Sequence, residues 1–219
     1  MAVREEDLTY GDPAAPHTLI VFSDFRCGYC RQAHEVIGEL VARMPGRLRV
    51  VAKHFPFHPS CNASVLVPRD QYARSCQAAQ AAEAVRSMGG AQPAKRYAEL
   101  LFEAPEDEPL DDERLVLVAG RVGVGRAEWQ AAYASGPVRD RIIEDIAEGR
   151  RLGVEAVPTF FLDGRRLEDI FIAGADAEVV DCVKTSSLWR RLGVGQAAGG
   201  SGAAQNGDIG CASPMPARP

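Results

Sequence analysis

Residues 18–44 constrain the fold of this chain more than any other stretch. Leu19 to Phe22 is a short apolar run with β-branched members, which suits a buried strand and is too short for a buried helix. From Cys30 onward the apolar residues recur at helical spacing, until Pro45-Gly46 ends the pattern. Cys27 and Cys30 therefore lie where a strand ends and a helix begins.

This Cys-x-x-Cys pair predicts a redox-active dithiol. Unpaired backbone N–H groups and the positive end of the helix dipole favour the thiolate of Cys27. Cys30, one turn later on the same side, can close a disulfide with it. A structural zinc site needs two more ligands, usually a second closely spaced pair. The nearest match in spacing, His54 and His58, is surrounded by aromatic residues and prolines. We expect no metal and no other cofactor.

Composition excludes several classes of protein. The chain has 219 residues, of which 46% are apolar, enough for an ordinary core, and six cysteines. Its net charge of -5 gives no reason to expect a nucleic-acid partner. No apolar stretch is long enough to span a bilayer, and the first seven residues do not resemble a signal peptide.

The remaining elements predict a mixed sheet with a helical insertion. After an irregular lead-in, strands are expected at 19–22 and 47–53, and these should pair in parallel because a helix connects them. Helices are expected at about 71–88, 94–103, 112–121, 127–135, 138–152 and 177–192. Asp163-Gly164 marks a hairpin between strands at 159–162 and 165–167. The expected parts are a lead-in (1–16), a first βαβ part with a Cys-rich loop (17–70), a helical insertion (71–136), a second α-β-β-α part (137–192) and a disordered tail (193–219).

Two stretches carry a resemblance to a known family. They are Phe22-Ser-Asp-Phe-Arg-Cys-Gly-Tyr-Cys30 and Gly153-Val-Glu-Ala-Val-Pro-Thr-Phe-Phe-Leu-Asp-Gly164. Together with the order of elements they resemble the thioredoxin fold, and the inserted helices make the chain similar to its DsbA-like group. The resemblance implies that Pro158 follows a cis peptide bond beside the active-site disulfide and that the neighbouring backbone holds substrate. The residues themselves indicate only that Val157, which precedes a proline, should be extended.

A second feature, the Cys-rich stretch around Cys61 and Cys76, narrows the resemblance. It is similar to thioredoxin-like domains associated with bacterial homologues of vitamin K epoxide reductase, where the corresponding cysteines would form an extra pair. Such a bond would close a loop of about 15 residues and stabilise by roughly 3 kcal/mol. A structural disulfide, a redox relay to Cys27 and Cys30, and two free thiols remain alternatives.

The sequence also departs from the DsbA-like pattern. The acidic residue that commonly lies six positions before the nucleophile is replaced by Val21, so Asp24 is the nearest carboxylate. Asp24 either accepts a proton from Cys30 or caps a loop. The dipeptide Gly28-Tyr29 matches that of DsbC-like isomerases, which however carry an N-terminal dimerisation domain and favour Thr at the position of Val157. A monomeric oxidase is therefore expected.

Five further residues have weaker interpretations. His34 can add positive character near Cys27 or be a solvated helix residue, whereas Phe160 and Phe161 are interpreted as core strand residues. Cys182 and Cys211 are expected in the last helix and the tail. They are either bonded to each other, or Cys211 is free or in an intermolecular disulfide and Cys182 is a small buried residue.

The predicted function is thiol:disulfide oxidoreductase, acting as a disulfide-forming oxidase on exported proteins. A substrate thiolate would attack the exposed Cys27 sulfur, and a second substrate thiol would displace Cys27. The resemblance implies re-oxidation by a quinone-linked membrane protein of the vitamin K epoxide reductase type. A periplasmic location is expected, with a cytoplasmic reductase as the alternative. Isomerase or reductase activity, a peptide-binding module and a metal-binding module are the rival functions.

Overall fold

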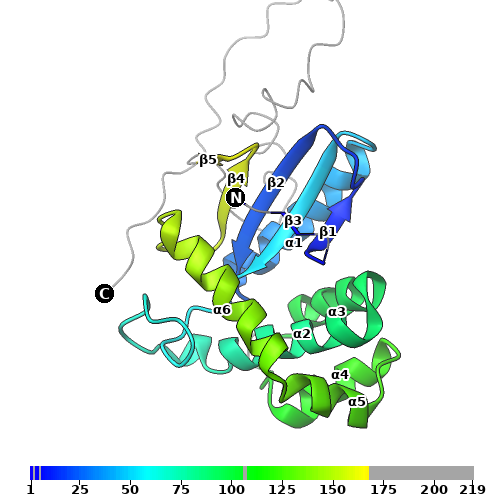
Figure 1. The fold of residues 1–219 in the computed structure, drawn as a ribbon, viewed down its shortest axis with the longest axis vertical. Helices are drawn as coiled ribbons and strands as arrows, with labels where there is room; N and C mark the ends of the chain where they lie inside the picture. Colours follow the sequence, from blue (N-terminus) through cyan, green and yellow to red (C-terminus); the bar gives the residue numbers. More distant parts are fainter. Residues whose placement is uncertain (2, 5, 106–107, 168–219) are drawn as a thin grey trace, which may run out of the picture.

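The computed structural model describes residues 1, 3–4, 6–105 and 108–167. Within these residues one five-stranded mixed sheet forms, in the order β1-β3-β2-β4-β5 (Figure 1). The strands are β1 Leu8–Gly11, β2 His17–Ser23, β3 Leu48–His54, β4 Thr159–Leu162 and β5 Arg165–Leu167. β2 and β3 are parallel, as predicted, and the other neighbours are antiparallel.

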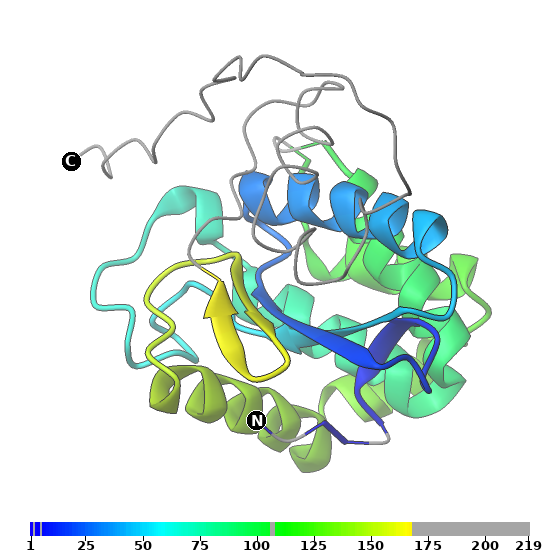
Figure 2. The same cartoon turned by 90° about the horizontal axis from the view of Figure 1, so that it is seen from above.

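The sheet is buried on both faces, which explains the uninterrupted apolar run in β2. Leu19 and Val21 point to the face covered by α1 (Gly28–Arg43), whereas Ile20 and Phe22 point to the face covered by α6 (Gly136–Arg151). Figure 2 shows these two helices on opposite sides of the sheet. The Cys-x-x-Cys pair, which follows the carboxyl end of β2, is therefore attached to a strand that is buried on both faces.

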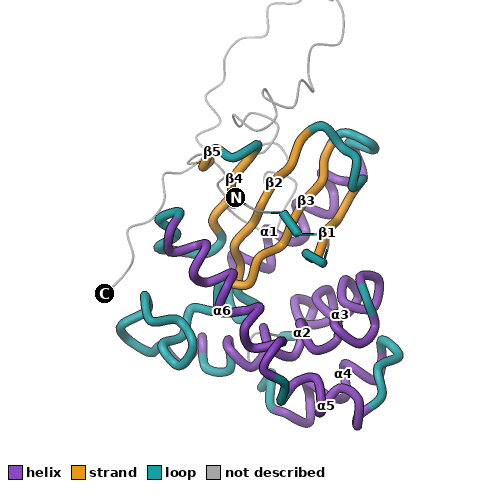
Figure 3. The backbone as a smooth tube through the Cα atoms, viewed as in Figure 1, coloured by secondary structure: helices purple, strands orange, loops and turns teal. Residues whose placement is uncertain are grey.

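The predicted helical insertion lies beyond one end of the sheet (Figure 3). It contains α2 Ser75–Gly89, α3 Ala91–Glu103, α4 Asp112–Arg121 and α5 Arg126–Tyr133. Their apolar faces form one core with Phe25, Cys27 and Cys30. The insertion therefore packs directly on the cysteine pair, and its first residues are placed to affect the chemistry there.

The lead-in and the starts of two helices differ from the sequence prediction by more than a shift of one or two residues. The lead-in is not irregular throughout, because Leu8–Gly11 forms β1 on the outer edge of β3. The second helix begins at Ser75 rather than Gln71, since a 3-10 turn, η1 Asp70–Tyr72, comes first and Arg74 has a left-handed φ of 74°. α3 begins at Ala91, so Pro93 lies in its first turn, where a missing N–H costs little.

Buried ion pairs anchor the lead-in to the core. Asp7 is 4% exposed, and its carboxylate accepts hydrogen bonds from Lys53 Nζ at 2.8 Å and from Arg141. Arg141 also contacts Asp145 on the next turn of α6. These ion pairs join the lead-in, β3 and α6, and burial makes them much less sensitive to salt than surface pairs.

Some predictions fall outside the described residues. They are the final helix at 177–192, the tail at 193–219, Cys182 and Cys211. In the part of the chain that the structure describes, no helix is both long enough and apolar enough to cross a membrane.

Candidate active site

The two cysteines of the Cys-x-x-Cys pair occupy the start of α1. Cys27 is the N-cap residue with extended backbone, and Cys30 lies in the first turn. Both are free thiols. Cys27 is only 2% exposed and Cys30 1%, so the expectation that the Cys27 sulfur is exposed is wrong for this reduced form. The insertion causes this burial, because its core encloses the pair.

Three groups lower the pKa of Cys27. The pKa of Cys27 lies below its ordinary value, chiefly because the Cys30 thiol donates a hydrogen bond to it. The backbone N–H of Cys30 and the hydroxyl of Tyr72 lower it further, while burial and the nearby Asp24 oppose them. Burial raises the pKa of Cys30 well above its usual range, and the Cys27 thiolate raises it further. The pair therefore holds its negative charge on Cys27.

Pro158 lies beside this sulfur, 131 residues along the chain from Cys27. The Val157–Pro158 peptide bond is cis. When it is protonated, the Cys27 thiol donates a hydrogen bond to the carbonyl oxygen of Val157 at 3.5 Å. The structure thus brings the two stretches of the family resemblance together, and Val157 shares the same core.

Tyr29, between the cysteines, is 63% exposed. Gly28 is the first residue of α1.

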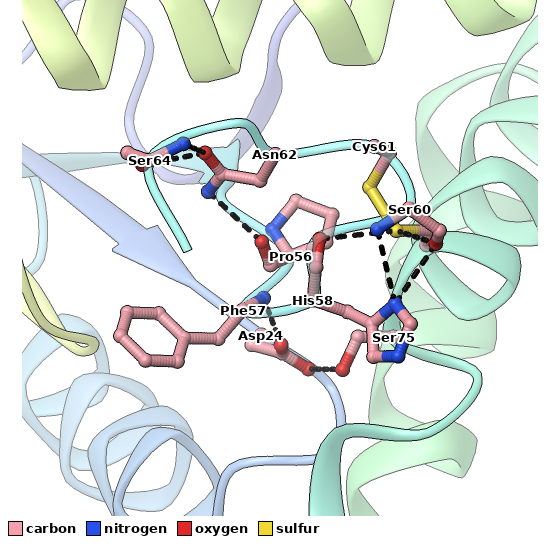
Figure 4. The surroundings of a disulfide bond; sticks show 10 residues. Asp24, Pro56, Phe57, His58, Ser60, Cys61, Asn62, Ser64 and Ser75 are labelled. Atoms are coloured by element: carbon pink, nitrogen blue, oxygen red, sulfur yellow. Dashed lines mark hydrogen bonds between the residues drawn. A yellow bond between two sulfur atoms is a disulfide. The ribbon is translucent and has the colours of Figure 1, made fainter. Parts of the chain in front are cut away.

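Asp24 is buried next to the cysteine pair and bonds to three groups. Its carboxylate accepts from Arg26 N at 2.7 Å, Phe57 N at 2.6 Å and the Ser75 hydroxyl at 2.9 Å. Figure 4 shows the carboxylate between Phe57 and Ser75. These bonds hold loops together, as the loop-capping alternative requires. Burial nevertheless raises the pKa of Asp24, which suits it to exchange a proton as well.

The buried sulfur of Cys30 has no carboxylate from β2 beneath it. Its neighbour there is Val21, which lines a small cavity together with Cys30 and His34. The cavity volume is about 30 Å³, enough for one or two water molecules. Asp24 contacts Cys30 instead through its backbone, whose N–H donates to Cys30 Sγ at 3.4 Å.

Cys61 and Cys76 form a disulfide, with Cα atoms 6.0 Å apart. The bond joins the loop after β3 to the first turn of α2, and its two cysteines are 15 positions apart in sequence. Ser75, the neighbour of Cys76, donates its hydroxyl to Asp24, so the disulfide is adjacent in sequence to a residue that contacts Asp24 (Figure 4).

The structure changes the roles that the sequence suggested for two residues, Tyr72 and His34. Tyr72 was missed, because only the folded chain shows that η1 reaches Cys27; an aromatic residue in a polar loop between two cysteines was the single hint. His34 stacks on Phe102 with ring centroids 4.9 Å apart, and burial lowers its pKa, so it is neutral and adds no positive character. Phe160 and Phe161 are core strand residues, as expected, each 4% exposed.

Comparisons with known proteins agree with this geometry. The sequence model of the family described as thioredoxin matches residues 4–175. The chain belongs to the thioredoxin family. Among curated proteins it is 30% identical over 183 residues to the Na(+)/H(+) antiporter NhaA of Herminiimonas arsenicoxydans, a match that covers 84% of this chain. The matched part is 26% of that antiporter, so the chain spans about a quarter of its length.

Solved structures show the same fold. The thiol-disulfide exchange protein alpha-DsbA2 from Wolbachia pipientis superposes with a TM-score of 0.63 at 15% identity, over 86% of this chain and 87% of that one. A periplasmic thioredoxin-like protein from Salmonella enterica serovar Typhimurium gives 0.62 at 18% identity, over 86% and 91%. The family model and these structures agree on the fold, and the Cys-x-x-Cys pair lies at the start of α1 within it.

Among the described residues, no group of three or more His, Cys, Asp or Glu side chains is placed to hold a metal ion.

Proposed function

We propose that this thioredoxin-family chain is a disulfide-forming oxidase, with Cys27 as the sulfur that exchanges with substrate. The observation that carries the proposal is the opposite displacement of the two thiol pKa values, lowered at Cys27 and raised at Cys30. A stabilised Cys27 thiolate is a good leaving group and favours the reduced protein, which makes the disulfide oxidising.

The reaction uses two substrate thiols. A substrate thiolate attacks Cys27 of the Cys27–Cys30 disulfide, and the S–S bond breaks with its electron pair on Cys30, which takes up a proton. A second substrate thiolate then attacks the substrate sulfur of the mixed disulfide and releases Cys27 as a thiolate. The substrate loses two electrons and the enzyme gains them. Asp24, whose pKa burial raises, is our candidate to give Cys30 its proton and to accept it on re-oxidation.

Substrate access belongs to the same proposal. The backbone around Pro158 lies next to Cys27 and would hold an extended stretch of the substrate chain. Because Cys27 is buried in the reduced form, the cover over it has to shift when a substrate cysteine approaches. Tyr29, between the two cysteines in sequence, is exposed and could contact a bound substrate.

The second disulfide supports the expected location, and the partners belong to the same proposal. A structural disulfide persists in oxidising compartments, which supports a periplasmic or other extracytoplasmic site of action. We expect a monomer, reduced or misoxidised proteins as substrates, and a quinone-linked membrane protein as the re-oxidant. The similarity to a quarter of an antiporter favours a second candidate, a redox domain that acts next to a membrane protein.

Reaction of the oxidised protein with a reduced two-cysteine peptide tests the proposal. We expect the wild-type protein to oxidise one peptide per Cys27–Cys30 disulfide. Cys30→Ser should form a mixed disulfide on Cys27 with glutathione disulfide and proceed no further. Cys27→Ser should do neither, although Cys61–Cys76 stays intact as an internal control.

Two results would contradict the proposal. Peptide oxidation by Cys27→Ser at the wild-type rate would show that the Cys-x-x-Cys pair does not react. Faster reduction of insulin by the reduced protein than oxidation of the peptide by the oxidised one would favour the reductase alternative.

A further inference from the structure

Tyr72 reaches the reacting sulfur from a part of the chain 45 residues away. Its hydroxyl is one of the groups that lower the pKa of Cys27. The side chain is 7% exposed and packs in the same core cluster as Cys27 and Cys30. Its ring contacts Phe57, with centroids 5.2 Å apart, so neighbours hold both the ring and the hydroxyl.

The backbone that carries Tyr72 is fixed to the active-site loop. Tyr72 N donates to Arg69 O at 2.9 Å within η1. Arg26, the residue before Cys27, donates from Nε to Gln71 O at 3.3 Å and from Nη1 to Glu108 O at 3.1 Å. The guanidinium therefore ties the residue next to Cys27 to the residue next to Tyr72.

The second disulfide closes the segment in which Tyr72 lies. Residues 61–76 carry no helix or strand other than η1 and the start of α2. At their ends, Cys61–Cys76 joins the loop to α2, and the Ser75 hydroxyl bonds to Asp24 at 2.9 Å. Without such closure, a segment rich in turns loses little by leaving the site, because few backbone hydrogen bonds hold it.

We propose that Tyr72 is a further catalytic residue, which stabilises the Cys27 thiolate by donating its hydroxyl, and that the Cys61–Cys76 disulfide holds it there. The inference rests on the proposed function, since it assigns a role at the same sulfur. The hydroxyl favours the thiolate over the thiol because it can donate to the sulfur and thiolate sulfur is the stronger acceptor. It thereby stabilises Cys27 as the leaving group and the reduced over the oxidised protein.

Tyr72→Phe tests this role, since it removes one oxygen and keeps the buried ring. The measurement is the rate of Cys27 alkylation by iodoacetamide against pH, followed by mass spectrometry of the peptide that contains Cys27. We expect the pKa of Cys27 to rise by about one unit, so that the thiolate fraction at low pH falls about tenfold. The equilibrium with glutathione should shift toward the Cys27–Cys30 disulfide by up to the same factor.

Tyr97→Phe is the matched control. Tyr97 is also a buried tyrosine of this core, but its hydroxyl donates to Leu115 O at 3.0 Å. Its loss should lower thermal stability and leave the pKa of Cys27 unchanged. The double variant Cys61→Ser/Cys76→Ser should raise the pKa of Cys27 in the same direction as Tyr72→Phe, and adding Tyr72→Phe to it should then change little.

Each outcome decides a separate question. An unchanged Cys27 pKa in Tyr72→Phe, with the variant folded by circular dichroism, would overturn the role of Tyr72. A disulfide-free variant that keeps the wild-type Cys27 pKa would overturn the positioning role of Cys61–Cys76. Neither result depends on peptide oxidation, so failure of the oxidase proposal would be seen separately.

Discussion

Cys27 and Cys30 lie within one helical turn, yet their surroundings move their acidities in opposite directions. Cys27 receives hydrogen bonds from the thiol and backbone of Cys30 and from Tyr72, all of which favour the thiolate. Cys30 is 1% exposed, and burial keeps it protonated. Because Cys30 donates to Cys27, the protonated Cys30 favours the Cys27 thiolate, and the thiolate in turn keeps Cys30 protonated. The negative charge of the pair therefore lies on Cys27.

This asymmetry predicts the pH dependence of alkylation in the reduced protein. Cys27 should react with iodoacetamide with a midpoint below about 8.5, the value of an unperturbed cysteine, and its rate should fall as the pH falls through that midpoint. Cys30 should remain unmodified throughout this range. A midpoint at or above 8.5, or earlier modification of Cys30, would contradict the assignment.

The same displacement is linked to the stability of the reduced protein. The pKa of Cys27 is lower in the folded than in the unfolded chain. Its stabilising contribution is therefore fully present above the unfolded value of about 8.5 and is lost as the pH falls through the folded value.

At the residue scale the sequence predicts what depends on local pattern and misses what depends on folding. The position of Cys27 at a strand-to-helix junction follows from periodicity alone. The surroundings of its sulfur do not, because Tyr72 and Val157 are brought there by tertiary contacts. Burial of Cys27 has the same origin, since Cys27 belongs to the core cluster that includes residues of the inserted helices.

At the element scale, the packing of α6 on the sheet depends on a residue without a side chain. A Cβ added at Gly149 would lie 2.6 Å from Phe55 Cε2 and 3.2 Å from Phe22 Cδ1. Both phenylalanines are fully buried, with 0% exposure, so neither can move toward solvent. The close approach of this helix to the sheet therefore requires glycine.

Gly149→Ala should destabilise the protein by about 1–3 kcal/mol, because overpacking outweighs the helix propensity of alanine. Gly120→Ala is the matched control: Gly120 is an exposed residue of α4, and an added Cβ would meet nothing within 4 Å. Gly120→Ala should stabilise the protein by up to about 1 kcal/mol. Denaturant unfolding measures both, and equal effects of the two changes would contradict the packing argument.

Most elements could be predicted because their signals are long or specific. α4 matches its expected range of 112–121, and the hairpin at Asp163-Gly164 has both φ angles positive, as the Asp-Gly pair predicts. β1 was missed because four residues at a sheet edge give too short a pattern, and its pairing with β3 is a tertiary contact. The start of α2 was misplaced because nothing local marks the left-handed Arg74.

At the scale of the whole molecule, the thioredoxin-like part positions the chemistry and the insertion adjusts it. The sheet, α1 and the Pro158 loop place Cys27 at a helix N-terminus beside a stretch of backbone. The stretch from the end of β3 to the first residue of α2 supplies Tyr72, Phe57 and Ser75, which interact with Cys27 or Asp24. The order of elements predicted this division, whereas the contacts between the two parts required the structure.

The central claim is that the whole arrangement makes Cys27–Cys30 an oxidising disulfide, and its reduction potential tests this most directly. The protein would be equilibrated in graded glutathione buffers and each thiol quantified by alkylation and mass spectrometry, which keeps Cys61–Cys76 separate. We predict a potential closer to that of DsbA, about -120 mV, than to that of thioredoxin, about -270 mV. A value near -270 mV would contradict the account and make the protein a reductase.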